Sequence, residues 1–361
     1  MRCFILSFIG VVLFVSCGKK ETFKPRDISI VEIEHLIQDS TLNVRAIDLV
    51  KPIGKYDFWN LNYAGSNRVV GEFVLNEVFE KKIENKGKFL FSHGDSLNYH
   101  FRSIANNSKA TFVLSIGSPA LLFKKDKFSN KFNIVYKEIH PKAFYDSMAF
   151  WNDQEGIAIG DSTDGCLSVI ITRDGGNTWR KLFCDDLPQG AENEGAFAAS
   201  DTNIAIVGNN TWVATTSGRV YYSPDKGITW DVFSTLIVKG KETEGIYSID
   251  FYDALNGFAI GGDYTNPDDN AANKIRTQDG GKTWQLVAQN QNPGYRSCVQ
   301  YIPNGKGKEL VVIGFKGIDY SNDSGKSWKH LSDEGFYTIR FLNDSIAYAA
   351  GVGRISKLVF R

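Results

Sequence analysis

The chain has 361 residues and carries 41 Lys and Arg against 41 Asp and Glu, so its formal net charge is zero. This balance argues against a nucleic-acid-binding protein, which needs a basic excess to neutralise phosphates, and against a polybasic membrane patch. Hydrophobic residues make up 42% of the chain and charged residues 23%, which is typical of an ordered globular protein. With 34 Gly, 13% aromatic residues and only 9 Pro, the composition favours many short strands joined by tight turns.

The first residues read as an export signal. Arg2 precedes an apolar run, residues 3–15, that is too short to span a bilayer and fits the core of a signal peptide. The run ends in Phe-Val-Ser-Cys, which resembles the cleavage site of bacterial lipoproteins. This resemblance implies that Cys17 is lipidated and that the protein is exported and anchored to the bacterial cell envelope. A plain secretory signal is the alternative. We expect three segments: a signal peptide at 1–17, a polar tether at 18–26 and a single domain at 27–361.

Three cysteines follow Cys17, and two of them lie at equal distances in sequence from Gly175, which we place in a hairpin turn. Cys166 and Cys184 would then face each other on neighbouring strands, where an exported protein can oxidise them to a disulfide. Two separate buried thiols are the alternative. The spacing of Cys and of the 5 His fits no zinc site, so we expect no metal and no cofactor.

A repeated motif is the strongest signal in the sequence. Four segments follow the pattern [ST]-x-D-x-G-x-[ST]-W, and they begin at Thr172, Ser223, Thr277 and Ser321. The pattern resembles the Asp-box (bacterial neuraminidase, BNR) repeat of β-propellers. In such a turn the Asp accepts hydrogen bonds from backbone N–H groups, the Gly supplies a positive φ, and the Trp packs between sheets. We assign a structural and not a catalytic role to Asp174, Trp179, Asp225, Trp230, Asp279, Trp284, Asp323 and Trp328.

Pairs of apolar strands recur ahead of these turns, the second of each pair ending in or near Gly. In the fourth unit we expect residues 195–199 to form the first strand and residues 203–208 the second. The units lie at 41–92, 97–139, 142–188, 192–238, 243–290, 294–333 and 335–361. The last unit lacks one strand, which residues 28–37 can supply. The sequence therefore predicts an all-β, seven-bladed β-propeller of four-stranded antiparallel blades, closed by an N-terminal strand.

Residues 41–361 are similar to the photosystem II assembly-factor type of propeller. The segments that carry the resemblance lie at 117–120, 148–151, 195–200, 261–264 and 294–297. The resemblance implies an assembly scaffold without catalysis that binds its partner through an arginine patch. Nothing in the sequence points to photosynthesis, so the resemblance predicts the fold and leaves the partner open.

Alignment of the innermost strands predicts a ring of side chains at one mouth of the central channel: Arg45, Arg102, Asp146, Glu194 or Gly195, Tyr247, Arg296 or Ser297, and Tyr337. Arg recognises carboxylate and phosphate groups through paired hydrogen bonds, so three Arg would make an anion-binding funnel. The alternative is a set of ordinary channel residues paired with one another and with water. We expect a monomeric, non-enzymatic propeller, without catalytic residues, that binds an envelope protein or peptide.

A glycan-binding or sialidase-like propeller is the second interpretation, because sialidases also use an Arg trio and carboxylates on an Asp-box propeller. Residues 101–104 lack the Pro of the sialidase Phe-Arg-Ile-Pro start, and no Tyr and Glu pair is placed as a nucleophile. Asp146 and Glu194 would act as acid and base only at a suitable separation.

Overall fold

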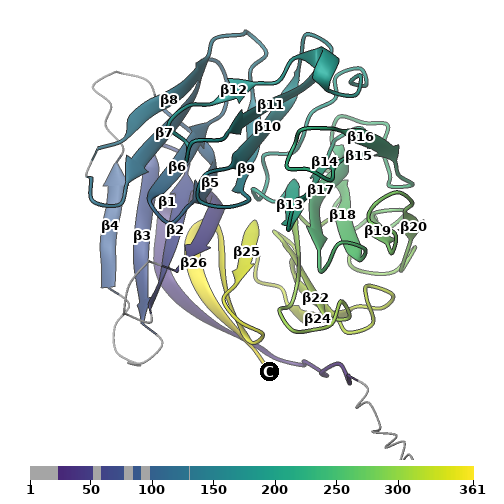
Figure 1. Ribbon diagram of the computed structural model, residues 1–361. Coiled ribbons are helices and arrows are strands. Elements are labelled where there is room, and N and C mark those ends of the chain that lie inside the picture. Colours follow the sequence, from purple (N-terminus) through teal and green to yellow (C-terminus); the bar gives the residue numbers. More distant parts are fainter. Residues whose placement is uncertain (1–22, 52–57, 77–83, 91–97, 130) are drawn as a thin grey trace, which may run out of the picture.

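Six β-sheets surround a central axis in the computed structural model, which describes residues 23–51, 58–76, 84–90, 98–129 and 131–361 (Figure 1). One sheet, here called the closing sheet, has six strands in the order β25-β26-β1-β2-β3-β4. These strands are β25 (Thr338–Phe341), β26 (Ile346–Phe360), β1 (Val31–Val50), β2 (Phe58–Gly65), β3 (Val69–Asn76) and β4 (Glu84–Leu90).

The other five sheets have four antiparallel strands each and are called blades A to E in chain order. Blade A holds β5 (Phe101–Asn106), β6 (Ala110–Ser115), β7 (Ala120–Asp126) and β8 (Asn133–Glu138). Blade B holds β9 (Tyr145–Phe150), β10 (Gly156–Thr163), β11 (Cys166–Thr172) and β12 (Arg180–Lys181), followed by the short 3-10 helix η1 (Cys184–Asp186). Blade C holds β13 (Ile204–Val207), β14 (Asn210–Ala214), β15 (Arg219–Ser223) and β16 (Asp231–Ser234).

Blade D holds β17 (Glu244–Phe251), β18 (Gly257–Asp263), β19 (Lys274–Thr277) and β20 (Gln285–Leu286). Blade E holds β21 (Cys298–Tyr301), β22 (Leu310–Gly314), β23 (Gly317–Ser321) and β24 (Lys329–Ser332). The strands next to the axis contact one another in chain order, and β25 in turn contacts β1, so the ring is closed. Among the described residues, no helix is long and apolar enough to cross a membrane.

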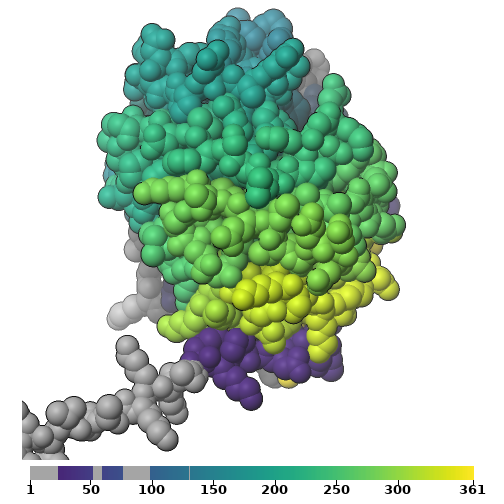
Figure 2. Space-filling model, turned by 90° about the vertical axis from the view of Figure 1, so that its right-hand side faces the viewer, coloured from purple at the N-terminus to yellow at the C-terminus, as the bar shows by residue number. Residues whose placement is uncertain are grey.

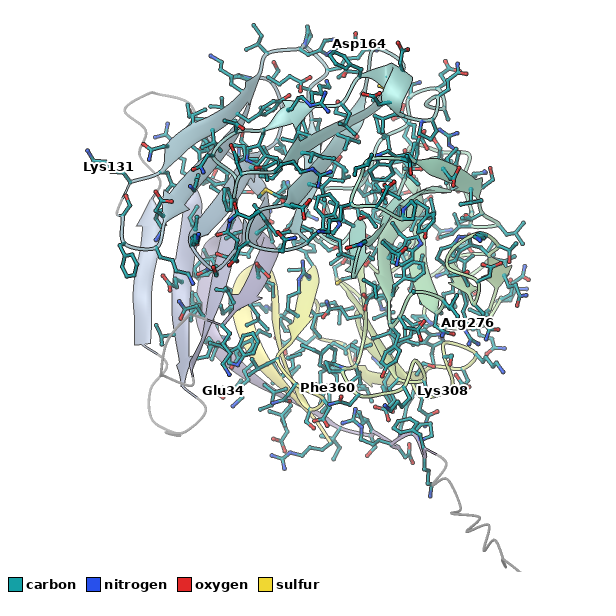
Figure 3. All side chains as sticks on the ribbon, viewed as in Figure 1. Glu34, Lys131, Asp164, Arg276, Lys308 and Phe360 are labelled. Atoms are coloured by element: carbon teal, nitrogen blue, oxygen red, sulfur yellow. A yellow bond between two sulfur atoms is a disulfide. The ribbon has the colours of Figure 1, made fainter. Side chains whose placement is uncertain are left out.

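The predicted count of seven blades is wrong, since the described residues form six sheets. The reason is β1, a strand of 20 residues that pairs with two neighbours. Its first half pairs with β26, with Val31 opposite Phe360, and its second half pairs with β2, with Ile47 opposite Tyr63. One continuous strand therefore merges the two ends of the chain into the closing sheet. Figures 2 and 3 show these ends side by side, with the purple N-terminal residues against the yellow C-terminal strands.

Blade C differs from the prediction in its first strand. Residues 195–203 form no strand, and β13, which was expected to be second, is the innermost strand. Asp201 explains the difference, because its carboxylate accepts hydrogen bonds from the backbone N–H groups of Ile104 in β5 and Met148 in β9. The segment is thus bound to other blades across the axis instead of pairing within its own blade.

Several middle strands of the blades are buried along their whole length. All residues of β11, β18 and β22 are buried, as expected for strands that are covered on both faces by neighbouring sheets. Aromatic side chains fill the space between blades. Phe112 of β6 lies 4.7 Å from Phe150 of β9, measured between ring centres. Each blade therefore buries its faces against the next one, and the sheets form one cooperative unit.

The four repeated turns contain the hydrogen bonds expected from the motif. In the turn between β11 and β12, the Asp174 carboxylate accepts hydrogen bonds from the N–H and the hydroxyl of Thr178, and the N–H of Gly176 donates to the Thr172 hydroxyl. Equivalent bonds are present in the turns that follow β15, β19 and β23. The turns lie between the two outer strands of blades B to E, away from the axis.

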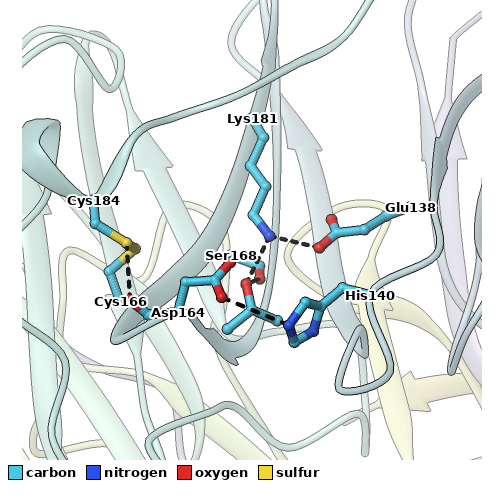
Figure 4. Close-up of a disulfide and its surroundings, with 8 residues drawn as sticks. Glu138, His140, Asp164, Cys166, Ser168, Lys181 and Cys184 are labelled. Atoms are coloured by element: carbon cyan, nitrogen blue, oxygen red, sulfur yellow. Dashed lines mark hydrogen bonds and ion pairs between the residues drawn. A yellow bond between two sulfur atoms is a disulfide. The ribbon is translucent and has the colours of Figure 1, made fainter.

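The disulfide between Cys166 and Cys184 is present and joins the start of β11 to η1 (Figure 4). Beside it, the Lys181 ammonium forms an ion pair with Glu138 of blade A and donates to the Thr163 hydroxyl. The outer edge of blade B is therefore held by a covalent bond within the blade and by an ion pair to its neighbour.

The glycine of each repeated turn is required for packing as well as for backbone conformation. Gly325 has a φ of 84°, and a Cβ added there would lie 2.1 Å from the ring of Phe258 in blade D. We expect Gly325→Ala to lower the free energy of unfolding by about 3 kcal/mol, the sum of left-handed backbone strain and overpacking. Chemical denaturation monitored by Trp fluorescence measures this change.

Gly208→Ala is the matched control, because Gly208 has a φ of 62° but open space where a Cβ would lie. Gly208→Ala should lower the free energy of unfolding only through backbone strain, by about 1 kcal/mol. If both variants lost the same free energy of unfolding, contact of residue 325 with the neighbouring blade would not contribute to the loss in Gly325→Ala.

Candidate functional site

Four of the sequence-predicted ring residues occupy the same structural position. The innermost strands β1, β5, β9 and β17 each contain a β-bulge, and the extra residues are Arg45, Arg102, Asp146 and Tyr247. A bulge changes the direction of the extra side chain and is common at rims and binding sites. Three of these side chains come together with Tyr337, the residue before β25. We call Arg45, Arg102, Tyr247 and Tyr337 the arginine mouth.

The two guanidinium groups of the arginine mouth lie close together, and no carboxylate of the described residues pairs with them. Arg45 stacks on Tyr337, with 3.8 Å from its Cζ to the ring centre, and Arg102 donates to the Ala198 carbonyl at 3.2 Å. Burial, with the nearby charge of Arg45, lowers the pKa of Arg102 to about 10. The Nε atoms of both side chains are buried and unpaired within the described part of the chain. The mouth therefore presents two cations with unused donors.

An aromatic surface adjoins these cations. Tyr247 stacks on Phe197 with 3.6 Å between ring centres, and Tyr295 meets Tyr247 edge-on at 4.7 Å. Tyr264 and Phe315 flank Tyr295 and are 48% and 41% exposed. We call Tyr264, Tyr295 and Phe315 the aromatic shelf. The shelf offers apolar contact area beside a positively charged site.

Glu194 and Arg296 form ion pairs elsewhere. Glu194 is buried and accepts hydrogen bonds from Arg219, Thr215 and Tyr221 in blade C. Arg296 is buried and forms an ion pair with Asp319 of β23, at 2.6 Å. These charges are neutralised inside the blades, so the expected trio of Arg is a pair in the structure. The alternatives offered for these positions bind backbone groups: the Gly195 carbonyl accepts a hydrogen bond from the N–H of Thr216, and the Ser297 hydroxyl donates to the carbonyl of Tyr337 in the arginine mouth.

Asp146 is fully buried, and neither of its carboxyl oxygens has a hydrogen-bond partner among the described residues. Burial and the neighbouring Asp161 raise its pKa well above the usual range. Burial also raises the pKa of Asp161 to about 6, although Asp161 accepts a hydrogen bond from the N–H of Ala196. Asp146 has no hydrogen-bond partner among the described residues, whereas the Glu194 carboxylate is bound by Arg219, Thr215 and Tyr221, so the two carboxyl groups lie in different surroundings.

Residues 195–203, here called the plug, form no strand and lie across the centre of the channel. Beside the bonds of Asp201 to β5 and β9, the Ser200 carbonyl accepts a hydrogen bond from Thr338 of β25. The Thr202 hydroxyl donates to Ser248 of β17. The plug thus forms hydrogen bonds with strands on opposite sides of the ring and closes the channel beneath the arginine mouth.

A cavity of about 270 Å³ lies on the other side of the plug. Its lining includes Asp48, Asp201, Asp250 and Arg340. Burial raises the pKa values of Asp201 and Asp250 to about 7 and also raises the pKa of Asp48. Sequence analysis missed this acidic cavity. A pattern in the sequence could have indicated it. Three of the predicted ring residues are each followed, three positions later, by a charged residue of the cavity: Asp48 after Arg45, Asp250 after Tyr247, and Arg340 after Tyr337.

Side chains of this cavity also connect the blades. The Asp48 carboxylate accepts a hydrogen bond from the N–H of Asn106 in β5, and the Asp250 carboxylate accepts one from Tyr301 in β21. The side-chain oxygen of Gln300, Oε1, accepts a hydrogen bond from the N–H of Phe341 in β25. Each of these bonds runs from one innermost strand to the next.

The raised pKa values make stability depend on pH in the acidic to neutral range. Asp201 and Asp250 hold protons up to about pH 7 in the folded state, whereas an unfolded Asp releases its proton near pH 3.9. Their contribution to stability is therefore fully present below about pH 4 and is lost as the pH rises to 7. We expect Tm to be lower at pH 7 than at pH 5 by about 4 °C or more, since 1 kcal/mol corresponds to roughly 2–4 °C.

Calorimetry of Asp250→Asn tests whether Asp250 contributes to this pH dependence. Removal of the titrating group should reduce the difference in Tm between pH 5 and pH 7. Asp253→Asn is the control, since hydrogen bonds in its turn lower the pKa of Asp253 and place its titration below this window. A wild-type Tm that rises from pH 5 to pH 7 would contradict the prediction.

Comparison with known proteins identifies the fold. No family model matches the chain, and no curated protein matches its sequence. Among solved structures, "YCF48 bound to D1 peptide" is similar with a TM-score of 0.61 and 13% identity, over 94% of this chain and 99% of that one. YCF48 from Cyanidioschyzon merolae has a TM-score of 0.59 and 12% identity, over 92% and 99%.

A propeller of a different kind, the WD40 domain of Doa1, has a TM-score of 0.55 and 12% identity, over 92% of this chain and 96% of that one. At such low identities the likeness concerns the backbone. The chain is a β-propeller similar in fold to the photosystem II assembly factor YCF48 and to WD40 domains.

Proposed function

We propose that this propeller binds a protein or peptide partner, without catalysis, and that the arginine mouth holds a carboxylate of that partner. The observation that carries the proposal is the pair of guanidinium groups, Arg45 and Arg102, whose buried Nε donors are unpaired among the described residues. Two adjacent cations repel each other, so an anion that binds between them relieves an unfavourable charge and fills open donors.

The surroundings favour a peptide over a small inorganic anion. The aromatic shelf lies beside the cations, and its exposed members Tyr264 and Phe315 provide contact area for an apolar side chain next to the carboxylate. Aromatic residues and Arg are the residues that most often dominate protein interfaces. That a solved structure of similar fold, YCF48, is a complex with a D1 peptide is consistent with peptide binding by such a propeller.

We further propose that the protein acts in the bacterial cell envelope, anchored through Cys17. Cys17 lies outside the described residues. The disulfide between Cys166 and Cys184 supports export, because disulfides persist in oxidising compartments and are rare in the cytosol.

The test compares peptide binding by the wild type and by the double variant Arg45→Ala/Arg102→Ala. The probes are N-acetylated decapeptides that end in an aromatic or apolar residue, each made with a free C-terminal carboxylate and as the amide. We expect the carboxylate form to bind, and the double variant to bind it about 10- to 100-fold more weakly, as loss of charged hydrogen bonds predicts. Fluorescence anisotropy measures the affinities.

The double variant Arg173→Ala/Arg180→Ala is the control, because it removes the same charge at the edge of blade B and should leave binding unchanged. Equal binding of the carboxylate and amide forms, or full affinity after loss of Arg45 and Arg102, would overturn the proposal.

A further inference from the structure

Asp146 is the least satisfied polar side chain near the arginine mouth. Its carboxyl group is fully buried, and no donor or acceptor of the described residues contacts it. Such a group loses its hydration without compensation, whether it is charged or neutral. The nearby charged group is Asp161 of β10, another carboxyl. Asp161 is half-buried, and two neighbouring carboxyl groups of which one is fully buried are costly to ionise together.

This pair is connected to the mouth through the first residues of the plug. Asp161 accepts a hydrogen bond from the N–H of Ala196 at 3.1 Å. The next residue, Phe197, stacks on Tyr247, and Ala198 accepts the hydrogen bond from Arg102. Three consecutive residues thus link Asp161 to an aromatic ring and a cation of the mouth.

The backbone before Ala196 is also pressed against Asp161. A Cβ added to Gly195 would lie 1.9 Å from the Asp161 Oδ1 atom, so the main chain runs in direct contact with this carboxylate. Asp161 therefore touches the main chain at residue 195 and is hydrogen-bonded to it at residue 196.

Other charged groups on the surrounding elements have their own partners. Arg102 of β5 bonds to Ala198, and Glu194, before the plug, is neutralised by Arg219. Asp201, within the plug, is held by backbone N–H groups of β5 and β9. Asp161 is thus the charged group that acts on Asp146.

We propose that Asp146 and Asp161 form a proton-controlled latch on the plug, which sets how tightly the arginine mouth binds its carboxylate partner. This regulation rests on the proposed function of the mouth. With at least one carboxyl group protonated, the pair carries no more than one negative charge, and Asp161 retains Ala196. When the last proton passes to solvent, the two neighbouring negative charges repel each other and Asp161 is driven away from Ala196. Phe197 and Ala198 then lose their fixed positions beneath the mouth.

The pKa directions agree with this geometry. Burial raises the pKa of Asp161 to about 6, and burial together with Asp161 raises that of Asp146 well above its usual range. Asp161 therefore loses its proton near pH 6, and Asp146 keeps its proton to a higher pH than an ordinary Asp does. The latch is therefore closed on the acidic side and opens as the pH rises.

Hydrogen exchange of the plug tests the latch without any ligand. In the wild type we expect the exchange protection of residues 195–199, corrected for intrinsic rates, to fall about tenfold between pH 6 and pH 8.5. Asp146→Asn removes one titrating charge and should keep the protection constant over this range. Asp161→Asn should also give a flat profile and serves if the first variant fails to fold.

Asp250→Asn is the matched control, because it removes a carboxyl group with a raised pKa from an innermost strand outside the latch. It should retain the pH-dependent protection of the wild type. A flat wild-type profile, or an unchanged pH dependence in Asp146→Asn and Asp161→Asn, would overturn the proposal.

The second measurement is the affinity of the free-carboxylate decapeptide at the same pH values. We expect about tenfold weaker binding at pH 8.5 than at pH 6 in the wild type, a coupling of ordinary size, and no change in Asp146→Asn. pH-dependent protection without any peptide binding would refute the proposed function and, with it, the regulatory part of the latch. Binding that does not change with pH while the protection does would overturn the coupling alone.

Discussion

Hydrogen bonds between the innermost strands are the constraint on which the rest of the molecule depends. Twisted sheets that radiate from an axis come closest at the axis, where apolar packing alone leaves backbone donors unpaired. Here Asp48, Asp250 and Gln300 each accept an N–H from the next innermost strand. Asp201 does the same from the plug and joins two strands at once. These side chains fix the blades around the centre, and the raised pKa values of Asp48, Asp201 and Asp250 reflect the loss of water around their carboxyl groups.

The outer parts of the blades are held differently. There the repeated turns present glycines to aromatic rings of a neighbouring blade, as Gly176 does to Phe112 and Gly281 to Trp212. Next to the axis, the blades are joined by hydrogen bonds of polar side chains, whereas their outer parts are joined by close apolar contacts. This division leaves the rim of the channel free to carry side chains that neither hold the blades nor fill the core. The arginine mouth occupies that rim.

The sequence predicted well what depends on local pattern. The four turns and the equivalent positions of Arg45, Arg102 and Tyr247 follow from the repeat. The plug could not be predicted, because Gly-Ala-Phe-Ala-Ala at residues 195–199 has the apolar character of a strand and its partners lie on other blades. The partners of Glu194 and Arg296 were missed for a different reason. Arg219 and Asp319 lie on the third strands of blades C and E, and the alignment compared only the innermost strands. The blade count was wrong because two units share one continuous strand.

The pairing of β1 with β26 has a consequence for how the chain reaches its native state. Strands β1 and β26 are separated by almost the whole chain. The first half of β1 therefore keeps an unpaired edge until β26 has been synthesised. Contacts between such distant segments form slowly and late. The bond between Cys166 and Cys184 spans only 18 residues and can form long before. Blades A to E can therefore assemble first, and loss of the final strand during translation would leave a nearly complete molecule with an open, aggregation-prone edge.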